Sequence, residues 1–582
     1  MRNAATALIT RVVATALVVI VIGLLPWLSG RDPALSVLRA RSADQEPTPE
    51  ALGAIRAELG LDQSPLQLFG RWFGGVLRGD FGRSWTSGDE VLPSILSAAG
   101  VSLTMMLAAL LIAVVIAVAV CLPTLIRGAR GTLRTGPTGV TASTLAAVPE
   151  FLLATLLMLG FAVWLRWLPP YGWEGGQHLI LPALALGLPA GGFLGRLVDD
   201  TLPAVFAERW VGLWRSAGCT PARIAAAAVR RAVPAVVPLF GLVAVGLTGG
   251  AVAVEAVFAV PGIGRTALDA AESQDLPLLQ GSVLILVLLG VVAGLLAQLT
   301  RRRLLGPGLR DEALTLTMPV TTVGRLQRVV PIVCAVLLAV VIGWGLFLEP
   351  LELDTTARLA APNWTHPLGT DSLGRDVLAR VGHGAAATAG VAILVCLASY
   401  VVAMVAGFLP SVTTGAAETA NAVPPVIAGI VVAAVLGPGT IGASIAVALV
   451  SWPSLAAHAA ALVQETRAAG YLTAQRAIGS SPTWILTRHV LPAVAGPVAR
   501  HAVIRLPAIA LALASLGFLG LGSQPPAPEW GATLAESLPY VERAPWAALA
   551  PVAMLLLLAA LAVSLSTLPA PRRTPAAEGI RG

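Results

Sequence analysis

The side chains of this 582-residue chain that could carry out catalysis form no recognisable reactive set. The chain contains no lysine, so it lacks the GxxxxGK[ST] loop, whose lysine reaches the terminal phosphates of ATP. There is no HExxH, no CxxC and no GxSxG placed between a strand and a helix. The histidines are scattered, and we expect helix-end or interfacial roles for them: His178, His366, His383, His458, His489 and His501. We predict that the chain is not an enzyme, that it has no catalytic residues and no metal site, and that any ATP hydrolysis comes from another polypeptide.

A segment that occurs twice points instead to the docking of a protein. The later copy, Tyr471 to Val494, reads YLTAQRAIGSSPTWILTRHVLPAV, and the earlier copy, Trp210 to Pro234, reads WVGLWRSAGCTPARIAAAAVRRAVP. Each has a short Arg-bearing helical stretch, a lone glycine (Gly479 or Gly218) and a second helical stretch. Glycine adopts the left-handed conformation that ends a helix without steric cost. The duplication predicts that two copies of one soluble partner dock on this chain.

The second helix of each copy has a clear start signal. Ser481-Pro482 in the later copy and Thr220-Pro221 in the earlier one place a capping hydroxyl before a proline at the first helical position. We therefore expect a rigid helix-turn-helix rather than a flexible loop in both places.

The composition places the chain in a lipid bilayer. Hydrophobic residues make up 56% and charged residues 12%, and the mean hydropathy is +0.82, which leaves too little charge to cover a water-soluble particle of this size. Runs of about 20 apolar residues, enough to cross a bilayer, occur about 12 times. They lie near residues 10–28, 97–123, 140–165, 179–198, 234–255, 280–300, 326–348, 385–410, 422–437, 439–458, 493–515 and 546–567.

Arginines predict the orientation of these spans, because short cytoplasmic loops retain positive charge. Arginines precede the first span, follow the second and sixth, and recur in both repeated segments. Both termini and both repeated segments are then cytoplasmic, in a multi-pass protein of the cell (inner or plasma) membrane. The net charge of +7 reflects this bias and does not indicate nucleic acid. We interpret the first apolar run as an uncleaved span rather than a signal peptide, because it continues to Leu28 with no small-x-small site directly after it. None of the four cysteines has ligand spacing, and we expect no disulfide.

The chain divides into two parallel six-span units in an all-α polytopic membrane protein. An even number of spans in each unit makes the units parallel, as expected when two homologous subunits have been fused. We predict a first unit at 1–303, a cytoplasmic linker at 304–325, a second unit at 326–570 and a cytoplasmic tail at 571–582. The long external loops are 29–94 and 349–384, and the cytoplasmic loops with the repeated segments are 199–233 and 459–492.

Both halves resemble permeases of the ABC importers for dipeptides, oligopeptides and nickel. The second half carries HPLGTDSLGRDVLAR (His366 to Arg380) and SLGFLGLGSQPPAPEWGATLAE (Ser515 to Glu536). The first half resembles the partner permease through IRAELGLDQSPLQLFGRWFGGVLRGDFGRSW (Ile55 to Trp85), HLILPALALGLP (His178 to Pro189) and VEAVFAVPGIGRTALDAAESQDLPLLQG (Val254 to Gly281). The resemblance implies a fused heterodimeric permease of the type I importer fold.

The resemblance also implies partners and cargo. An extracytoplasmic binding protein would deliver peptides or a related small solute, with nickel or a metal chelate also carried by similar systems. Two ATPase subunits, or one fused ATPase, would bind ATP and Mg, so that this chain binds no cofactor. In that family the repeated segment is the EAA loop, whose short helix sits in a cleft of the ATPase. Carried over to this sequence, the coupling residues are Arg215, Ala217, Gly218, Thr220, Arg223, Thr473, Ala474, Ala477, Gly479, Ser481, Arg488 and His489.

The sequence departs from the family pattern in these loops. The acidic position of the motif is Thr473 in the later copy, and we assign it to Leu213 in the earlier copy, where the bulky Trp214 follows in place of alanine. The earlier copy also lacks the usual histidine before its proline. These changes predict asymmetric docking on two non-identical ATPases.

Charge within the penultimate span suggests a contact with cargo. Arg500, His501 and Arg505 lie there, and charge inside a bilayer is costly enough to indicate function. Arg500 can snorkel to the cytoplasmic face. We assign His501 and Arg505 to the substrate pathway and expect Arg505 to favour a peptide carboxylate or another anionic cargo.

The external loops are expected to meet the binding protein. Mixed charge for a transient, salt-sensitive contact is offered in one loop by Asp371, Arg375 and Asp376, and in the other by Asp80, Arg83 and Arg78. Trp530, beside Glu529, has the ordinary role of an aromatic anchor at the membrane surface.

Two other classes of protein remain open at this point. A proton-coupled secondary transporter of major-facilitator type also has two six-span halves, but needs no docking segment and usually carries an intramembrane carboxylate. Glu255 and Glu418 lie near span ends. A receptor or scaffold is the third class, and the lack of a sizeable soluble domain argues against it.

Overall fold

The protein is helical throughout the part that the computed structural model describes, which comprises residues 2–29, 33–41, 46–61, 63–133, 142, 145–146, 148–305, 325–421 and 423–566. Within these ranges the only extended pairings are two isolated bridges, Arg83 with Glu90 and Thr370 with Asp376. Most of the predicted linker, the whole predicted tail and the start of the third predicted span lie outside the described residues.

Seven helical segments are long and apolar enough to cross a bilayer, and an eighth is a bent pair. The long segments are α6 (Val91–Arg130), α9 (Gly176–Phe206), α13 (Leu276–Leu305), α15 (Val377–Phe408), α18 (Thr440–Ala468), the run of α20 (Pro482–Ile485), η4 (Leu486–Val490) and α21 (Leu491–Phe518), and α23 (Pro545–Ser566). The pair is α16 (Pro410–Asn421) with α17 (Pro425–Leu436), which bends by 93°.

Shorter apolar stretches account for the remaining predicted spans. They lie in α1 (Arg2–Gly23), in α8 (Glu150–Leu157) with η1 (Met158–Trp164), in α11 (Pro221–Val257) and in α14 (Arg325–Gly345). Each of the 12 predicted spans therefore overlaps an apolar helix, and the prediction of an all-α polytopic membrane protein is confirmed.

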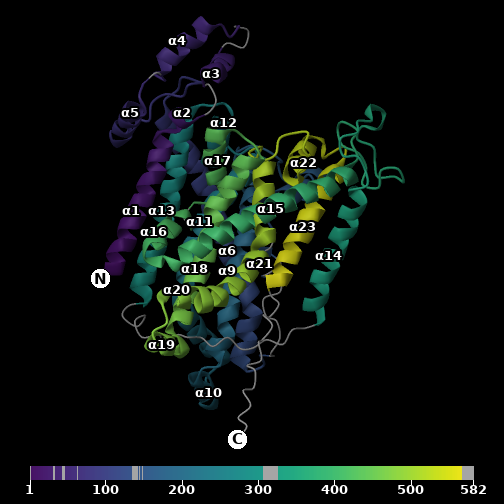
Figure 1. Ribbon diagram of the computed structural model, residues 1–582. Helices are drawn as coiled ribbons and strands as arrows, with labels where there is room; N and C mark the ends of the chain where they lie inside the picture. Colours follow the sequence, from purple (N-terminus) through teal and green to yellow (C-terminus); the bar gives the residue numbers. More distant parts are fainter. Residues whose placement is uncertain are drawn as a thin grey trace.

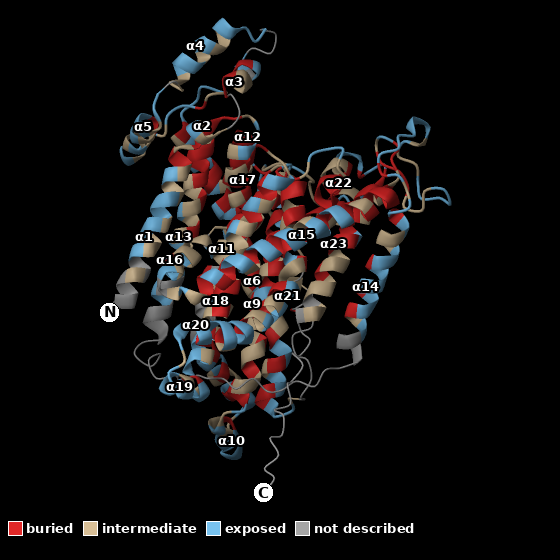
Figure 2. Ribbon diagram, in the orientation of Figure 1, coloured by how far each residue is buried: buried red, intermediate tan, exposed pale blue. Residues whose placement is uncertain are grey.

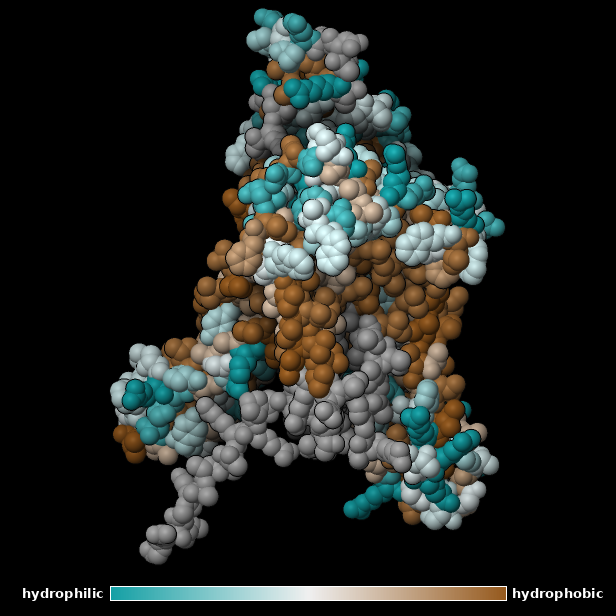
Figure 3. All heavy atoms as spheres, turned by 90° about the vertical axis from the view of Figure 1, so that its right-hand side faces the viewer, coloured by the Kyte–Doolittle hydropathy of each residue, from teal (hydrophilic) through white to brown (hydrophobic). Residues whose placement is uncertain are grey.

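The long helices stand side by side in one bundle (Figure 1). One end of the bundle carries α10 (Arg209–Ser216) and α19 (Gly470–Ala477); the other carries α12 (Ile263–Glu272) and α22 (Trp530–Ser537). Beyond α12 lie α2 (Leu25–Leu28), α3 (Pro33–Arg41), α4 (Pro49–Leu59) and α5 (Pro65–Leu77). A broad apolar band separates hydrophilic atoms at the top from two hydrophilic lobes at the lower corners (Figure 3). This distribution is that of a membrane protein with polar material at both faces.

The two units repeat one arrangement. In the first unit α6 packs along α9, and in the second α15 packs along α18. A hydroxyl lies 11 residues into each leading helix, Ser102 in α6 and Thr388 in α15, and each bonds to a buried glutamate, Glu255 or Glu529. Both glutamates also accept bonds from backbone N–H groups of the short helix at that end, α12 or α22. The repeat therefore extends to side-chain contacts.

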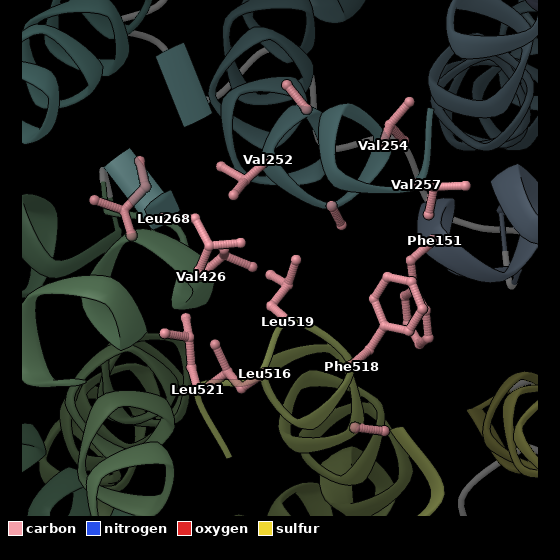
Figure 4. Close-up of a cluster of buried hydrophobic side chains, with 14 of the residues drawn as sticks. Phe151, Val252, Val254, Val257, Leu268, Val426, Leu516, Phe518, Leu519 and Leu521 are labelled. Carbon is pink, nitrogen blue, oxygen red and sulfur yellow. The ribbon is translucent and has the colours of Figure 1, made fainter. Parts of the chain in front are cut away.

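The units share one apolar core. In Figure 4 side chains of the first unit, Phe151 and Leu268 among them, face Val426, Phe518 and Leu519 of the second. The rings of Phe151 and Phe518 are 5.3 Å apart between centroids. Buried residues concentrate in this centre, whereas α4, α10 and α19 are mainly exposed (Figure 2).

Two further contacts join the units. Gly249 of α11 faces Pro424 just before α17, so closely that a Cβ on the glycine would lie 2.5 Å from the proline ring. On the outside, α1 packs against α16, and Arg11 pairs with Glu418. The two units are therefore interlocked along their length.

Candidate functional site

Both repeated segments form the predicted helix-turn-helix at the same end of the bundle (Figure 1). In the first unit α10 ends before Gly218, whose φ is +75°, and α11 begins at Pro221. In the second, α19 ends before Gly479, whose φ is +84°, and α20 begins at Pro482. A side chain at these φ values is strained, which explains why glycine occupies both turns.

The predicted caps are also present. The Thr220 hydroxyl accepts a bond from the Arg223 N–H at 3.4 Å, and the Ser481 hydroxyl accepts one from the Trp484 N–H at 3.2 Å. These bonds satisfy an N–H group that the first turn of a helix leaves free.

Each segment is held by its own small apolar core. Val211 and Ile224 are buried in the first segment, and Leu472 and Ile485, with the same separation of 13 residues, are buried in the second. Both cores are distinct from the main core of the bundle. With one side of each segment packed on its apolar core, most residues of the opposite, outer face are exposed in the described structure.

The predicted coupling residues lie on this outer face. All except the half-buried His489 are exposed: Arg215, Ala217, Gly218, Thr220, Arg223, Thr473, Ala474, Ala477, Gly479, Ser481 and Arg488. The His489 ring packs edge-on to Tyr471, with centroids 5.9 Å apart. The geometry is suited to docking, and the docking itself stays a prediction.

The two segments differ in how they are tied to the bundle. Arg215 donates to the carbonyl oxygens of Gly128 and Ala129, at the last turn of α6, at 2.5 and 3.4 Å. Among the described residues Arg476 of the second segment makes no comparable bond. One correction concerns the motif: Thr473 lies six residues before Gly479, and the residue six before Gly218 is Gly212, so Gly212 rather than Leu213 corresponds to Thr473.

A cavity of about 710 Å³ lies between the two units. Its wall comes from α8, α9 and α11 of the first unit and from α16, α17, α18, α21 and α23 of the second. The lining is mainly apolar, with Asn421, Ser451 and Ser515 as uncharged polar groups. Among the described residues only two charged side chains line it, Glu150 and Arg505.

Arg505 lies in the wall of this cavity, and its assignment to a substrate pathway stays a prediction. His501 does not line the cavity in the part of the chain described; its ring packs on that of His458, with centroids 4.7 Å apart. His501 lies four residues before Arg505, which is about one helical turn or about 6 Å along the same side of α21, and its assignment to the substrate pathway stays a prediction. Arg500 is exposed.

Sequence reasoning missed Glu150. This glutamate is the first residue of α8, after Pro149, and its side chain lies against Gly250 of α11. A Cβ at Gly250 would come within 3.2 Å of the Glu150 carboxyl carbon, so the glycine makes room for the acid. The cavity therefore receives a carboxylate from the first unit and a guanidinium from the second.

The predicted external loop of the second unit joins α15 and α22 in a largely buried cluster of four charges. Asp371 accepts from Arg375 at 2.7 Å and from Arg380 at 2.8 Å, and Glu536 of α22 accepts from the same two arginines at 2.7 and 2.8 Å. Asp371 and Arg375 are each 4% exposed. Their prediction as contacts for a binding protein is corrected: their charges are used inside the loop, which they fasten to α22.

Other external residues have mixed outcomes. Asp376 caps α15 through the Ala379 N–H at 2.9 Å and pairs with His366 at 2.7 Å. Asp80, Arg83 and Arg78 are exposed, and their contact with a partner stays a prediction. Trp530 is 3% exposed and donates to the Val381 carbonyl at 2.8 Å, so it is a core residue and not an anchor at the membrane surface.

Glu529 caps α22 from a buried position. Its carboxylate accepts from the N–H groups of Gly531 at 3.0 Å and Ala532 at 2.9 Å. Burial raises the pKa of Glu529 to about 7, although these bonds and one from Thr388 favour the charged form. In the first unit Asp275 has a related role, since it accepts bonds from Ser84, Trp85 and Thr86 of the external loop.

Comparison with known proteins agrees with the repeat. The model of a family described as "Binding-protein-dependent transport system inner membrane component" matches residues 130–310 and again residues 397–575. The di/tripeptide transport system permease protein DppC of Pseudomonas aeruginosa (strain UCBPP-PA14) is 34% identical over 240 residues, which cover 38% of this chain and 78% of that protein. A putative peptide permease protein of Brucella suis biovar 1 (strain 1330) is 33% identical over 223 residues, 36% of this chain and 72% of its own. A putative peptide transport system permease protein of Brucella abortus (strain 2308) is 32% identical over 312 residues, 50% of this chain and 96% of its own. One relative is thus covered almost whole by half of this chain, as expected of two fused permeases.

Proposed function

We propose, from the premise that this chain belongs to the family of binding-protein-dependent transport system inner membrane components, that it is the membrane permease of an ATP-driven importer of peptides. The observation that carries the proposal is the paired helix-turn-helix segment, present once in each family match and exposed at one end of the bundle. The relatives' names, which refer to peptide transport, support the choice of cargo.

The mechanism follows from the rigidity of the two segments. Two ATPase subunits, or the halves of one fused ATPase, would bind α10 and α19. ATP binding and hydrolysis would then move these two helices toward or away from each other. Because Val211 and Leu472 fasten these helices to the ends of the long helices, the displacement passes into the bundle as rigid-body motion. The permease itself hydrolyses nothing, and ATP and Mg belong to the ATPases.

The proposal includes an orientation and a partner on each face. We place α10, α19 and both termini in the cytoplasm and the end with α12 and α22 outside, where an extracytoplasmic binding protein delivers the cargo. The units are those of the sequence analysis, 1–303 and 326–570, with the linker 304–325 and the tail 571–582 inside.

Two alternatives to this proposal concern the cargo and the class of transporter, and they are not equally supported. Nickel or a metal chelate is the alternative cargo, carried by systems that the sequence resembles. A proton-coupled transporter of major-facilitator type has no support, because each unit matches the family of binding-protein-dependent permeases and contains a docking segment.

The test is ATP hydrolysis by the permease reconstituted in lipid with candidate ATPases and binding proteins. Peptide-loaded binding protein should stimulate hydrolysis. Gly218→Val and Gly479→Val should remove the stimulation, whereas Gly218→Asn and Gly479→Asn should retain most of it, because asparagine tolerates positive φ. Apart from its chain neighbours, no atom of the described residues lies within 4 Å of a Cβ at either glycine, so the variants test backbone conformation. Uptake driven by a proton gradient, with no ATPase bound, would refute the proposal.

A further inference from the structure

The central cavity is lined by one acidic and one basic side chain that have no ion-pair partner among the described residues. Glu150 and Arg505 both line it, and neither belongs to any of the ion pairs formed by the described residues. The remaining wall is mainly apolar. Charges in such surroundings are costly unless a counter-charge reaches them.

The two charges come from different units and different kinds of position. Glu150 begins α8 in the first unit, and Arg505 lies in the middle of α21 in the second. Only a solute that enters between the units can touch both. The Glu150 carboxylate accepts hydrogen bonds from a cation, and the planar Arg505 guanidinium donates to a carboxylate.

We propose that Glu150 and Arg505 form a two-point site that holds the ammonium and the carboxylate ends of a short zwitterionic peptide during its passage. The site rests on the proposed function and deepens it by naming the groups that select the cargo. A volume of about 710 Å³ is within the usual range for small-ligand sites, roughly 300–1,000 Å³. The rest of the described wall is mainly apolar and can accept peptide side chains of many kinds. The site therefore recognises the two charged ends of the peptide and is largely insensitive to the peptide sequence.

Phe151 lines the cavity, and its ring faces that of Phe518 (Figure 4), at the end of α21, a helix that packs against α22. Phe151 directly follows Glu150, so any movement of α8 that parts the two rings also shifts the carboxylate relative to Arg505. Opening toward the binding protein and loading of the two-point site are therefore mechanically linked.

The experiment measures binding to the purified permease–ATPase complex in nanodiscs without a binding protein. The probes are radiolabelled trialanine, N-acetyl-trialanine and trialanine amide. Their binding is measured by a scintillation proximity assay. Trialanine should bind about tenfold or more tightly than either blocked peptide, because each blocked form leaves one charge of the site unpaired. Glu150→Gln should abolish the preference for trialanine over the N-acetyl peptide only. Arg505→Gln should abolish the preference over the amide only.

Arg500→Gln is the matched control, since Arg500 lies on the same helix, is exposed and does not line the cavity. It should leave both preferences unchanged. Equal binding of the three probes, or variants that leave the preferences intact, would overturn the two-point site. Uptake of trialanine delivered by a binding protein is measured in parallel with the same complex. A complex that takes up trialanine but shows no preference between probes contradicts the site alone, whereas a complex without ATP-driven uptake contradicts the proposed function.

Discussion

Buried acidic residues hold together the end of each unit that carries α12 or α22, and they do so from different places in the sequence. In the first unit Glu255, at the end of α11, reaches forward to the N–H of Arg265 in α12. In the second unit Glu529 caps its own helix, α22. Both meet a hydroxyl of the leading helix, from Ser102 or Thr388. The interaction is shared by the two units even though the residues that make it are not aligned in the sequence.

The protonation of Glu529 should make stability depend on pH. Its pKa is raised by burial from 4.5 to about 7, so the folded protein holds the proton more tightly than the unfolded chain does. The contribution of Glu529 to stability is thus fully present below about pH 4.5 and is lost as the pH rises through about 7, by roughly 3 kcal/mol. The melting temperature in detergent, followed by tryptophan fluorescence from pH 5 to 8, should fall more for the wild type than for Glu529→Gln. Glu542→Gln, at an exposed position, should follow the wild type, and parallel curves for all three proteins would refute the effect.

The cluster of Asp371, Arg375, Arg380 and Glu536 is neutral as a set, so removal of one member should cost more than removal of a balanced pair. Arg380 is fully buried and bonds to both acids. Arg380→Met leaves an excess buried negative charge and should destabilise the protein by about 3–5 kcal/mol. Arg380→Met combined with Glu536→Gln leaves the Arg375–Asp371 pair intact and should recover part of this loss. The measurement is a double-mutant cycle on thermal unfolding; strictly additive effects would show that the four charges are not coupled.

At the scale of elements, the two docking helices have the same fold but different attachments. Only α10 is bonded through Arg215 to the end of α6 in the described structure. Arg215→Gln should remove these charged bonds, worth about 1.5–3 kcal/mol, and speed amide hydrogen exchange in residues 209–217 by about tenfold or more. Arg476→Gln is the control in α19 and should change exchange in residues 470–477 far less. Equal effects in the two helices would show that the bonds of Arg215 do not stabilise α10 relative to α19.

The helices could be predicted from the sequence to the extent that they are continuous apolar runs. All 12 predicted spans overlap apolar helices, because hydrocarbon thickness sets their length. The helix-turn-helix segments were also predictable, since Gly218, Gly479, Thr220 and Ser481 give local signals. The sharp bend between α16 and α17 was not, because packing between units decides where Pro424 and Pro425 lie.

The cavity charges were only half predictable. Arg505 was found because arginine inside an apolar run is conspicuous, whereas Glu150 lies at the start of a helix, where an acidic residue is ordinary. A comparison of the two halves could have found it: Val148-Pro149-Glu150 corresponds to Val423-Pro424-Pro425, so the first unit has an acid where the second has a second proline. The burial of Arg375 was hidden because one of its two acidic partners, Glu536, is about 160 residues away in the sequence.

At the scale of the whole molecule, fusion into one chain should not be needed for assembly. The units share the apolar core of Figure 4 and the contact of α1 with α16. Residues 1–305 and 325–582, co-expressed as separate polypeptides, should therefore co-purify in a 1:1 ratio and retain ATP hydrolysis stimulated by the binding protein. The measurement is affinity purification through a tag on one half, and separation of the halves on extraction from the membrane would contradict it.

Under the proposed function, cargo enters at the end with α12 and α22, and the shared core must open there. Phe151 lines the cavity, and the ring of Phe518, across the boundary between the units, lies 5.3 Å from the Phe151 ring between centroids. We propose that a cargo entering from the binding protein passes between these two rings, because they join the two units beside the cavity. We expect Phe151→Cys with Phe518→Cys, joined by a short cleavable thiol cross-linker, to block uptake, and reduction of the linker to restore it.

The native Cys121, Cys219, Cys334 and Cys396 are free and must first be replaced. Each single cysteine variant, treated with the same reagent, is the control for lost aromatic packing. Basal ATP hydrolysis should persist in the linked protein, since α10 and α19 lie at the opposite end of the bundle. Uptake at the unlinked rate would place the pathway elsewhere and would remove Glu150 and Arg505 from it as well.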